Sequence, residues 1–171
     1  EYNLEQIITD LLDQSIEVVL RFHPMSLRHQ PQLKSRFQER FGQDDTFSID
    51  DRMESTEAFR KSDIALTEWS GAAHEFSFGL LRPSIFINTP NKSNTDDRTL
   101  LSTSCFEDLV RGELGAAVEL ADSGEIPDVV RDLRRDATNI RTRLDGLRSQ
   151  HIYNPNRSVT VAADQLLEML N

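Results

Sequence analysis

Residues 63–87 constrain the fold more than any other stretch of the chain. A short apolar run at 64–66 leads into the small residues Ser70 to Ala73, and Pro83 introduces a second apolar run at 84–87. Between the two runs, apolar residues recur at helical spacing. They are Ala73, Phe76, Leu80 and Leu81. A strand, a small-residue turn, a helix and a second strand make a βαβ unit, which joins two parallel strands.

The turn that opens this helix is the first candidate binding site. Ser70 is a favoured N-cap residue, and Gly71 allows a ligand to approach the backbone closely. The unpaired N–H groups and the dipole of a helix N-terminus attract anions, phosphate above all. We therefore expect Ser70, Gly71 and Ala72 to bind phosphate; a cap that only stabilises the helix is the alternative. The chain contains neither the glycine fingerprint of dinucleotide-binding folds nor a P-loop.

The rest of the chain repeats the alternation of strands and helices. Strands are expected at residues 15–22, 46–49, 64–66, 84–87 and 115–119. Further helices are expected at 4–12 (capped by Asn3), 31–41, 51–61 (capped by Asp51 with Glu54), 106–111, 123–147 (capped by Ser123 or Asp122) and 158–170. This order predicts an α/β fold, a Rossmann-like parallel sheet with helices on both faces. The run 18–20 is apolar throughout, as expected for a parallel strand covered on both faces.

The whole chain, residues 1–171, is expected to form a single domain. Because it begins at Glu1 without a methionine, we expect it to be a fragment of a longer protein. The net charge of −10 disfavours nucleic-acid binding, and no apolar run approaches the ~20 residues of a membrane-spanning helix. The single cysteine, Cys105, permits no intrachain disulfide, which fits a reducing compartment such as the cytoplasm.

A basic segment and a histidine lie beside the first expected strand. Residues 21–40 hold five basic side chains against Glu39 alone; these are Arg21, Arg28, Lys34, Arg36 and Arg40. Such an island fits a small anionic ligand, although a solvated helix face is the alternative for its distal members. His23 comes at the carboxyl end of the strand, the edge where open α/β sheets bind ligands. It could donate to a phosphate or transfer a proton, or it could simply end the strand.

Glu75 is the remaining candidate, about one turn into the central helix. Its carboxylate could accept hydrogen bonds from vicinal hydroxyls such as those of ribose; a surface acid favoured by the helix dipole is the alternative. No set of residues has the spacing of a zinc site or a calcium loop, and no motif of a catalytic nucleophile is present. We therefore expect no metal and no cofactor, and binding chemistry more than covalent chemistry.

Three motifs together resemble the C-terminal half of GT-B-fold transferases. They are Arg21–Pro24, the segment 62–71 followed by Glu75–Phe76, and Arg82–Phe86. The resemblance points to the CDP-glycerol glycerophosphotransferases of teichoic-acid and capsule synthesis, in which one strand ends in His-Pro and a later one precedes a serine turn. The spacing of Ser70, Gly71 and Glu75 is also similar to that of UDP-sugar 2-epimerases and related glycosyltransferases. The match keeps its order over about residues 18–87.

The resemblance implies a nucleotide-diphosphate donor as substrate. It implies that His23 is the active-site histidine, that Ser70 and Gly71 hold the donor diphosphate, and that Glu75 holds the ribose or a neighbouring hydroxyl. Arg21, Arg28 and Ala72 are expected at the same phosphates. An acceptor domain would precede this one in the same chain, and the enzyme would act in the cytoplasm, with peripheral association at the inner face of the membrane.

Two other functions stay open at this point. The chain differs from the family pattern at Glu68–Trp69, Gly71 and His74. These differences leave the donor unassigned, and they leave room for a non-catalytic doubly wound interaction module. Half of a UDP-sugar 2-epimerase is the third possibility.

Overall fold

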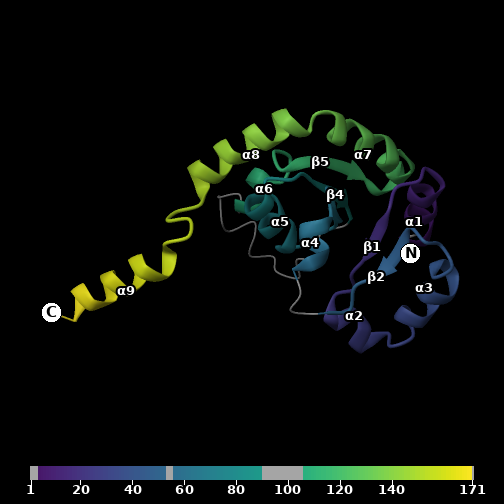
Figure 1. The fold of residues 1–171 in the computed structure, drawn as a ribbon, viewed down its shortest axis with the longest axis horizontal. Helices are drawn as coiled ribbons and strands as arrows, with labels where there is room; N and C mark the ends of the chain where they lie inside the picture. Colours follow the sequence, from purple (N-terminus) through teal and green to yellow (C-terminus); the bar gives the residue numbers. More distant parts are fainter. Residues whose placement is uncertain (1–3, 53–55, 90–105, 171) are drawn as a thin grey trace, which may run out of the picture.

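The computed structural model describes residues 4–52, 56–89 and 106–170, in which parallel strands alternate with helices (Figure 1). The strands form two small sheets. In the first, β1 (Val18–Leu20) pairs with β2 (Phe47–Ile49). In the second, β4 (Ser84–Asn88) pairs with β3 (Ala65–Thr67) on one side and β5 (Gly115–Glu119) on the other. The α/β class and the parallel pairing are confirmed, but the expected single sheet is divided between β1 and β3.

Helices connect and follow these strands. The first are α1 (Leu4–Asp13), α2 (Pro24–His29), α3 (Leu33–Phe41), α4 (Glu57–Lys61), α5 (Ala72–Leu80) and α6 (Phe106–Val110). After β5 come a 3-10 helix, η2 (Leu120–Glu125), and then α7 (Ile126–Arg135), α8 (Ala137–His151) and α9 (Ser158–Met169). The βαβ unit expected at 63–87 is therefore present as β3, α5 and β4.

Several of the expected boundaries were wrong. The first strand spans only 18–20, because Pro24 begins an unforeseen helix, α2, and proline is favoured in the first helical turn. The expected helix at 51–61 begins at Glu57. The expected helix at 123–147 is broken: residues 120–125 are 3-10, and Asp136 (φ −96°, ψ 15°) separates α7 from α8. The expected caps Asn3 and Glu54 and most of the polar segment 88–104 lie outside the described residues.

The core of the larger sheet is built around β4. Ile85, Phe86 and Ile87 are all buried, and successive residues point to opposite faces of the sheet. Ile85 and Ile87 pack with α1 and α7, whereas Phe86 packs with α5 and α8. A separate cluster joins α1, α3 and β2 through Ile8, Phe37, Phe41 and Phe47. Helices therefore cover both faces of the three-stranded sheet.

The strands β1 and β3 are covered less completely than β4. Every residue of both strands is only half-buried, although Val18, Val19, Leu20 and Leu66 are apolar. The expectation that 18–20 would be covered on both faces is therefore wrong. The reason is the separation of the two sheets, which exposes both strands to a cleft between them.

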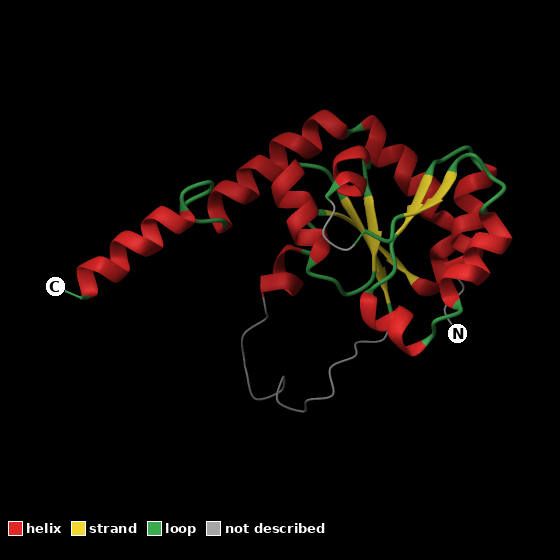
Figure 2. Cartoon of the chain, turned by 60° about the horizontal axis from the view of Figure 1, so that its bottom comes forward, coloured by secondary structure: helices red, strands yellow, loops and turns green. Residues whose placement is uncertain are grey.

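The last helix extends away from the rest of the chain (Figures 1 and 2). It follows a turn in which Asn154 and Asn156 adopt positive φ angles of 52° and 62°, a conformation that asparagine tolerates better than most residues. No residue of α9 is buried, and its exposed apolar side chains include Leu166, Leu167 and Met169. None of the helices in the described part of the chain has the length and hydrophobicity needed to cross a bilayer.

Two leucine-to-alanine substitutions, one in the core and one in α9, should have different effects on the stability of the fold. Leu144 of α8 is 0% exposed, so Leu144→Ala should lower the free energy of unfolding by about 3 kcal/mol through lost burial and an unfilled cavity. Leu166 of α9 is 62% exposed, so Leu166→Ala should change it by less than about 0.5 kcal/mol. Urea unfolding followed by circular dichroism measures both. Equal losses would contradict the packing described for these two helices.

Candidate functional site

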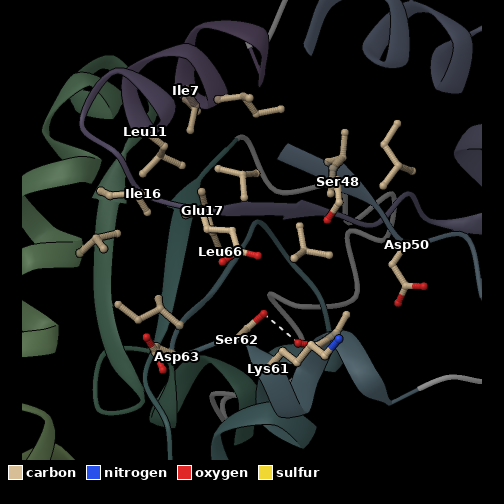
Figure 3. A pocket seen from close by; sticks show the side chains of 18 of the residues that line it. Ile7, Leu11, Ile16, Glu17, Ser48, Asp50, Lys61, Ser62, Asp63 and Leu66 are labelled. Atoms are coloured by element: carbon tan, nitrogen blue, oxygen red, sulfur yellow. Dashed lines mark hydrogen bonds between the residues drawn. The ribbon is translucent and has the colours of Figure 1, made fainter. Parts of the chain in front are cut away.

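A cleft with a volume of about 730 Å³ separates the two sheets (Figure 3). Residues of β1 and the end of β2 line one side of it, and residues of α4 and β3 line the other. The chain runs outward from β1 to β2 and then from β3 through β4 to β5, so the strand order reverses at this cleft. In open α/β folds, ligands bind at such a reversal, outside the carboxyl ends of the strands; Asp50, Asp51 and Arg52 come directly after the carboxyl end of β2.

The walls of the cleft are apolar and its rim is charged. The apolar lining comes from α1, β1, β3 and α7; it includes Ile7, Leu11, Ile16, Val18, Leu66 and Val130. Charged residues at the rim include Glu17, Asp51, Arg52, Glu57, Lys61, Asp63 and Arg134. An apolar body with a few polar groups at defined positions is the usual composition of a small-molecule site.

Asp50, immediately after β2, is the one residue with a buried acidic group among the described cleft-lining residues. Its side chain is 4% exposed. The Oδ1 atom accepts hydrogen bonds from the Arg52 backbone N–H (3.2 Å) and from Arg52 Nε (3.1 Å). The Oδ2 atom is buried and has no hydrogen-bond partner. A buried acceptor without a hydrogen bond lowers the stability of the fold. A donor from a ligand or a water molecule would remove this cost.

Ion pairs tie the end of β2 to the start of α4. Arg52 Nη1 and Lys61 Nζ each lie 2.6 Å from a carboxylate oxygen of Glu57. Lys61 first and then Arg52 lower the pKa of Glu57 to about 2. The neighbouring Asp51 pairs with Lys34 of α3, which lowers its pKa as well. Asp51 therefore bonds to α3 and does not cap α4, contrary to the sequence-based expectation.

His23 caps α2. Its Nδ1 accepts a hydrogen bond from the Met25 N–H (3.1 Å), and its imidazole is exposed. Because Nδ1 acts as an acceptor, the neutral ring carries its proton on Nε2. The structure therefore places His23 just beyond the carboxyl end of β1, as expected, with a local capping role that accounts for its position.

Arg21 lies beside the cleft, next to Arg52. Its Nη2 donates to the backbone carbonyl of Arg52, and its guanidinium lies 5.8 Å from the ring centroid of Phe59. It also lines a small recess together with Asp50 and Asp51. Arg28, by contrast, is exposed in the last turn of α2.

The Ser70 turn satisfies its own backbone groups. The helix begins at Ala72 with Gly71 as its cap, one residue later than expected. Ser70 Oγ accepts from the Ala72 N–H (3.3 Å), and the Ser70 carbonyl accepts from the Ala73 N–H (3.3 Å). The amide expected to bind phosphate at Ala72 thus has a partner within the turn. Gly71 has φ −59° and open space around its α-carbon, so the fold does not require glycine there.

The predicted site residues are not all brought together. Glu75 is exposed on α5, and neither it nor His23 nor any residue of 70–72 lines the cleft. Within residues 4–52, 56–89 and 106–170, no hydrogen bond or ion pair links His23 to the Ser70 turn. Of the seven candidates, only Arg21 lies beside the cleft and its buried carboxylate.

Sequence reasoning missed Asp50 and Arg111. Asp50 follows β2 directly, so the strand-end rule that was applied to His23 would have found it. Arg111 is only 9% exposed; its guanidinium lies 4.0 Å from the Trp69 ring centroid and 4.6 Å from that of Phe86. It donates to the carbonyls of Glu68 and Ile87, both at 3.1 Å, and thereby ties the ends of β3 and β4 together. No spacing pattern marks it in the sequence.

No family model, curated protein or solved structure was found to match this chain. Within the parts of the chain that the structure describes, no group of three or more His, Cys, Asp and Glu side chains is arranged to hold a metal ion.

The ion pairs of Glu57 lead to a measurable prediction. Lys61→Met should raise the Glu57 pKa from about 2 toward its ordinary value of 4.5, because it removes the largest stabilising contact of the carboxylate. The stability that the lowered pKa provides is present above pH 4.5 and is lost as the pH falls toward 2. The variant should therefore lose less stability over that interval than the parent does.

Carbon-13 NMR of the Glu57 carboxyl group during an acid titration measures this pKa directly. Arg60→Met is the matched control, because Arg60 lies beside Lys61 on α4 and contributes only backbone groups to the observed hydrogen bonds. An unchanged Glu57 pKa in Lys61→Met would show that the ion pair does not form in solution.

Proposed function

We propose that this chain is the donor-binding domain of a transferase that uses a nucleotide-diphosphate donor. The reaction would be glycosyl or glycerophosphoryl transfer in the synthesis of a bacterial surface polysaccharide or a teichoic-acid-like polymer. The observation that carries the proposal is the cleft at the reversal of strand order, with Arg21 in a small recess beside it. A Rossmann-like domain that binds a nucleotide uses this position. The order of the motifs from residue 18 to residue 87 supports the same reading.

The charges of the rim suggest how the donor diphosphate would be held. Because the amides of Ala72 and Ala73 already have partners, we assign the diphosphate mainly to Arg21, with Arg52, whose charge is shared with Asp50 and Glu57, beside it. Guanidinium groups bind phosphate with two parallel hydrogen bonds and stabilise the charge that develops as the nucleotide leaves. His23, with its proton on Nε2, would donate a hydrogen bond from Nε2 to a phosphate oxygen of the donor as the nucleotide leaves.

The rest of the machinery would come from outside this domain. An acceptor domain N-terminal to it in the same protein would bring the growing polymer to the donor. Peripheral association of the full protein with the inner face of the membrane would fit such an acceptor. The chain by itself would bind the donor without turning it over.

Binding of the donor nucleotide is the direct test. We expect at least one of CDP, UDP, ADP and GDP to bind, and Arg21→Met to weaken that binding about tenfold, since charge-assisted hydrogen bonds to phosphate are lost. Arg143→Met, on the exposed face of α8, is the control and should leave the affinity unchanged. Isothermal titration calorimetry measures each affinity. A folded sample that binds none of the four at millimolar concentration would overturn the proposal.

A non-catalytic interaction module is the second candidate. It is favoured by the Ser70 turn, where the hydroxyl and the carbonyl take up the amides as a structural cap would.

The two candidates differ in what they predict for His23. If the domain is catalytic, His23→Ala in the full-length protein should lower the transfer rate about a hundredfold or more, because a hydrogen-bond donor to the phosphate charge is lost. His29→Ala, a second exposed histidine of α2, should have little effect. Transfer of a radiolabelled donor to polymer measures both rates. Unchanged rates in both variants, with preserved folding, would favour the interaction module.

A further inference from the structure

We infer that the cleft between β1 and β3 binds the nucleoside part of the donor, with the sugar hydroxyls on Asp50 Oδ2 and the base between the open edges of the two strands. This inference rests on the proposed function and deepens it. It moves the hydroxyl-binding role from Glu75, which is exposed on α5, to Asp50 at the end of β2.

The size and the lining of the cleft fit a nucleoside. Its volume of about 730 Å³ falls within the ~300–1,000 Å³ typical of sites for small organic ligands. Apolar side chains of β1 and β3 remain half-buried against it, although parallel strands inside an α/β fold are normally covered on both faces. A flat ring placed there would complete the burial of Val18, Val19 and Leu66.

The strand edges supply the hydrogen bonds that a base requires. Val18 and Leu20 direct their backbone groups toward β2, as the bonds Val18 N–H to Thr46 O and Asp50 N–H to Leu20 O show. Successive residues of a parallel strand address opposite edges, so the N–H and the carbonyl of Val19 face the cleft. By the same alternation those of Leu66 face it from β3, because Ala65 bonds toward β4. No strand pairs with either edge in the described residues.

The carboxylate of Asp50 selects a hydroxyl over a second cation. Arg52 Nε already lies 3.1 Å from Oδ1, so the negative charge has a counter-charge. The remaining Oδ2 is buried and lacks only a hydrogen-bond donor. A neutral hydroxyl provides one without placing another charge in an apolar cleft, where an unbalanced charge is costly. Ribose offers two adjacent hydroxyls for this purpose.

The position of Asp50 also orients the ligand. Figure 3 shows Asp50 to one side of the cleft, away from Asp63 and Ile16. Arg52 bonds to Asp50, and Arg21 bonds to the Arg52 carbonyl, so both guanidinium groups lie on the Asp50 side. A sugar on Asp50 would thus direct its 5′ substituent, the diphosphate, toward these arginines. The base would extend toward β3 and the half-buried Leu66.

Calorimetry with paired variants tests the role of Asp50. The probes are CDP, UDP, ADP and GDP, with their 2′-deoxy and 3′-deoxy forms. Asp50→Asn should weaken binding of the ribonucleotide about tenfold or more, because a charge-assisted hydrogen bond is lost. Asp45→Asn is the control: Asp45 is exposed in the turn before β2 and lines neither the cleft nor the recess beside it, so the affinity of this variant should stay within about twofold of the parent. The deoxy form that lacks the hydroxyl bound by Asp50 should bind the parent protein with the same reduced affinity that the ribonucleotide shows for Asp50→Asn. This deoxy form should also bind Asp50→Asn and the parent protein with equal affinity.

Hydrogen exchange gives a readout that needs no substitution. Bound nucleotide should slow exchange of the Val19 and Leu66 amides about tenfold or more, while the exposed amides of α9 stay unchanged. If Asp50→Asn fails to fold, this result and the deoxy series in the parent protein decide the question.

The outcomes separate the inference from the proposed function. The inference alone is overturned if nucleotide binding depends on Arg21 but not on Asp50 or on a ribose hydroxyl, and if the bound nucleotide does not slow hydrogen exchange at Val19 and Leu66. Free nucleosides that bind with dependence on Asp50, while the diphosphate adds no affinity, support the inference and overturn the proposed phosphate site. Absence of any binding overturns both.

Discussion

The absence of hydrogen bonding between β1 and β3 governs the rest of this structure. In the described residues β1 pairs only with β2 and β3 only with β4, so each leaves one edge open toward the other. Buried backbone groups nearly always find a partner, and an open edge at the centre of a fold must be hydrated or bonded to something else. The cleft of about 730 Å³ lies at that opening, and its charged rim forms where the two sheets end.

The walls of the cleft are held apart by a shared core and not by flexible segments. Ile7 and Leu11 of α1 pack in one cluster with Ile85 and Ile87 of β4, and Val18 of β1 and Leu66 of β3 contact that same cluster. Arg131 of α7 also bonds to Gln14, just after α1. One helix therefore bridges both sheets on the apolar side, and the ion pairs of Arg52 and Glu57 bridge them at the rim. A cleft fixed on two sides loses little freedom when a ligand enters.

The sequence allowed the local elements to be predicted, but not the break between the sheets. Apolar runs and caps located α1, α3, α5, β4 and β5, because hydrophobic periodicity and turn residues act within a few positions. Whether the free edge of Val19 pairs with β3 depends on contacts between residues nearly fifty positions apart. Hydrophobic periodicity describes only neighbouring positions and cannot predict such contacts. The break at Asp136 is similarly invisible, since the apolar face continues from Ile126 to Leu147 across it.

The same limit explains the candidate site. Ser70 and Gly71 have the composition of an anion-binding turn, but composition could not show that the Ser70 hydroxyl and carbonyl would take up the amides of Ala72 and Ala73. In the sequence, Asp50 and Asp51 look like an ordinary acidic turn. Only the structure shows that the Asp50 carboxylate is buried. A carboxylate with one oxygen bonded to Arg52 and the other buried without a donor is a stronger indication of a ligand than an exposed acid such as Glu75. An unsatisfied buried acceptor destabilises the chain that carries it, whereas an exposed one is hydrated at no cost. A donor from a ligand or from a water molecule would remove this cost at Asp50 Oδ2.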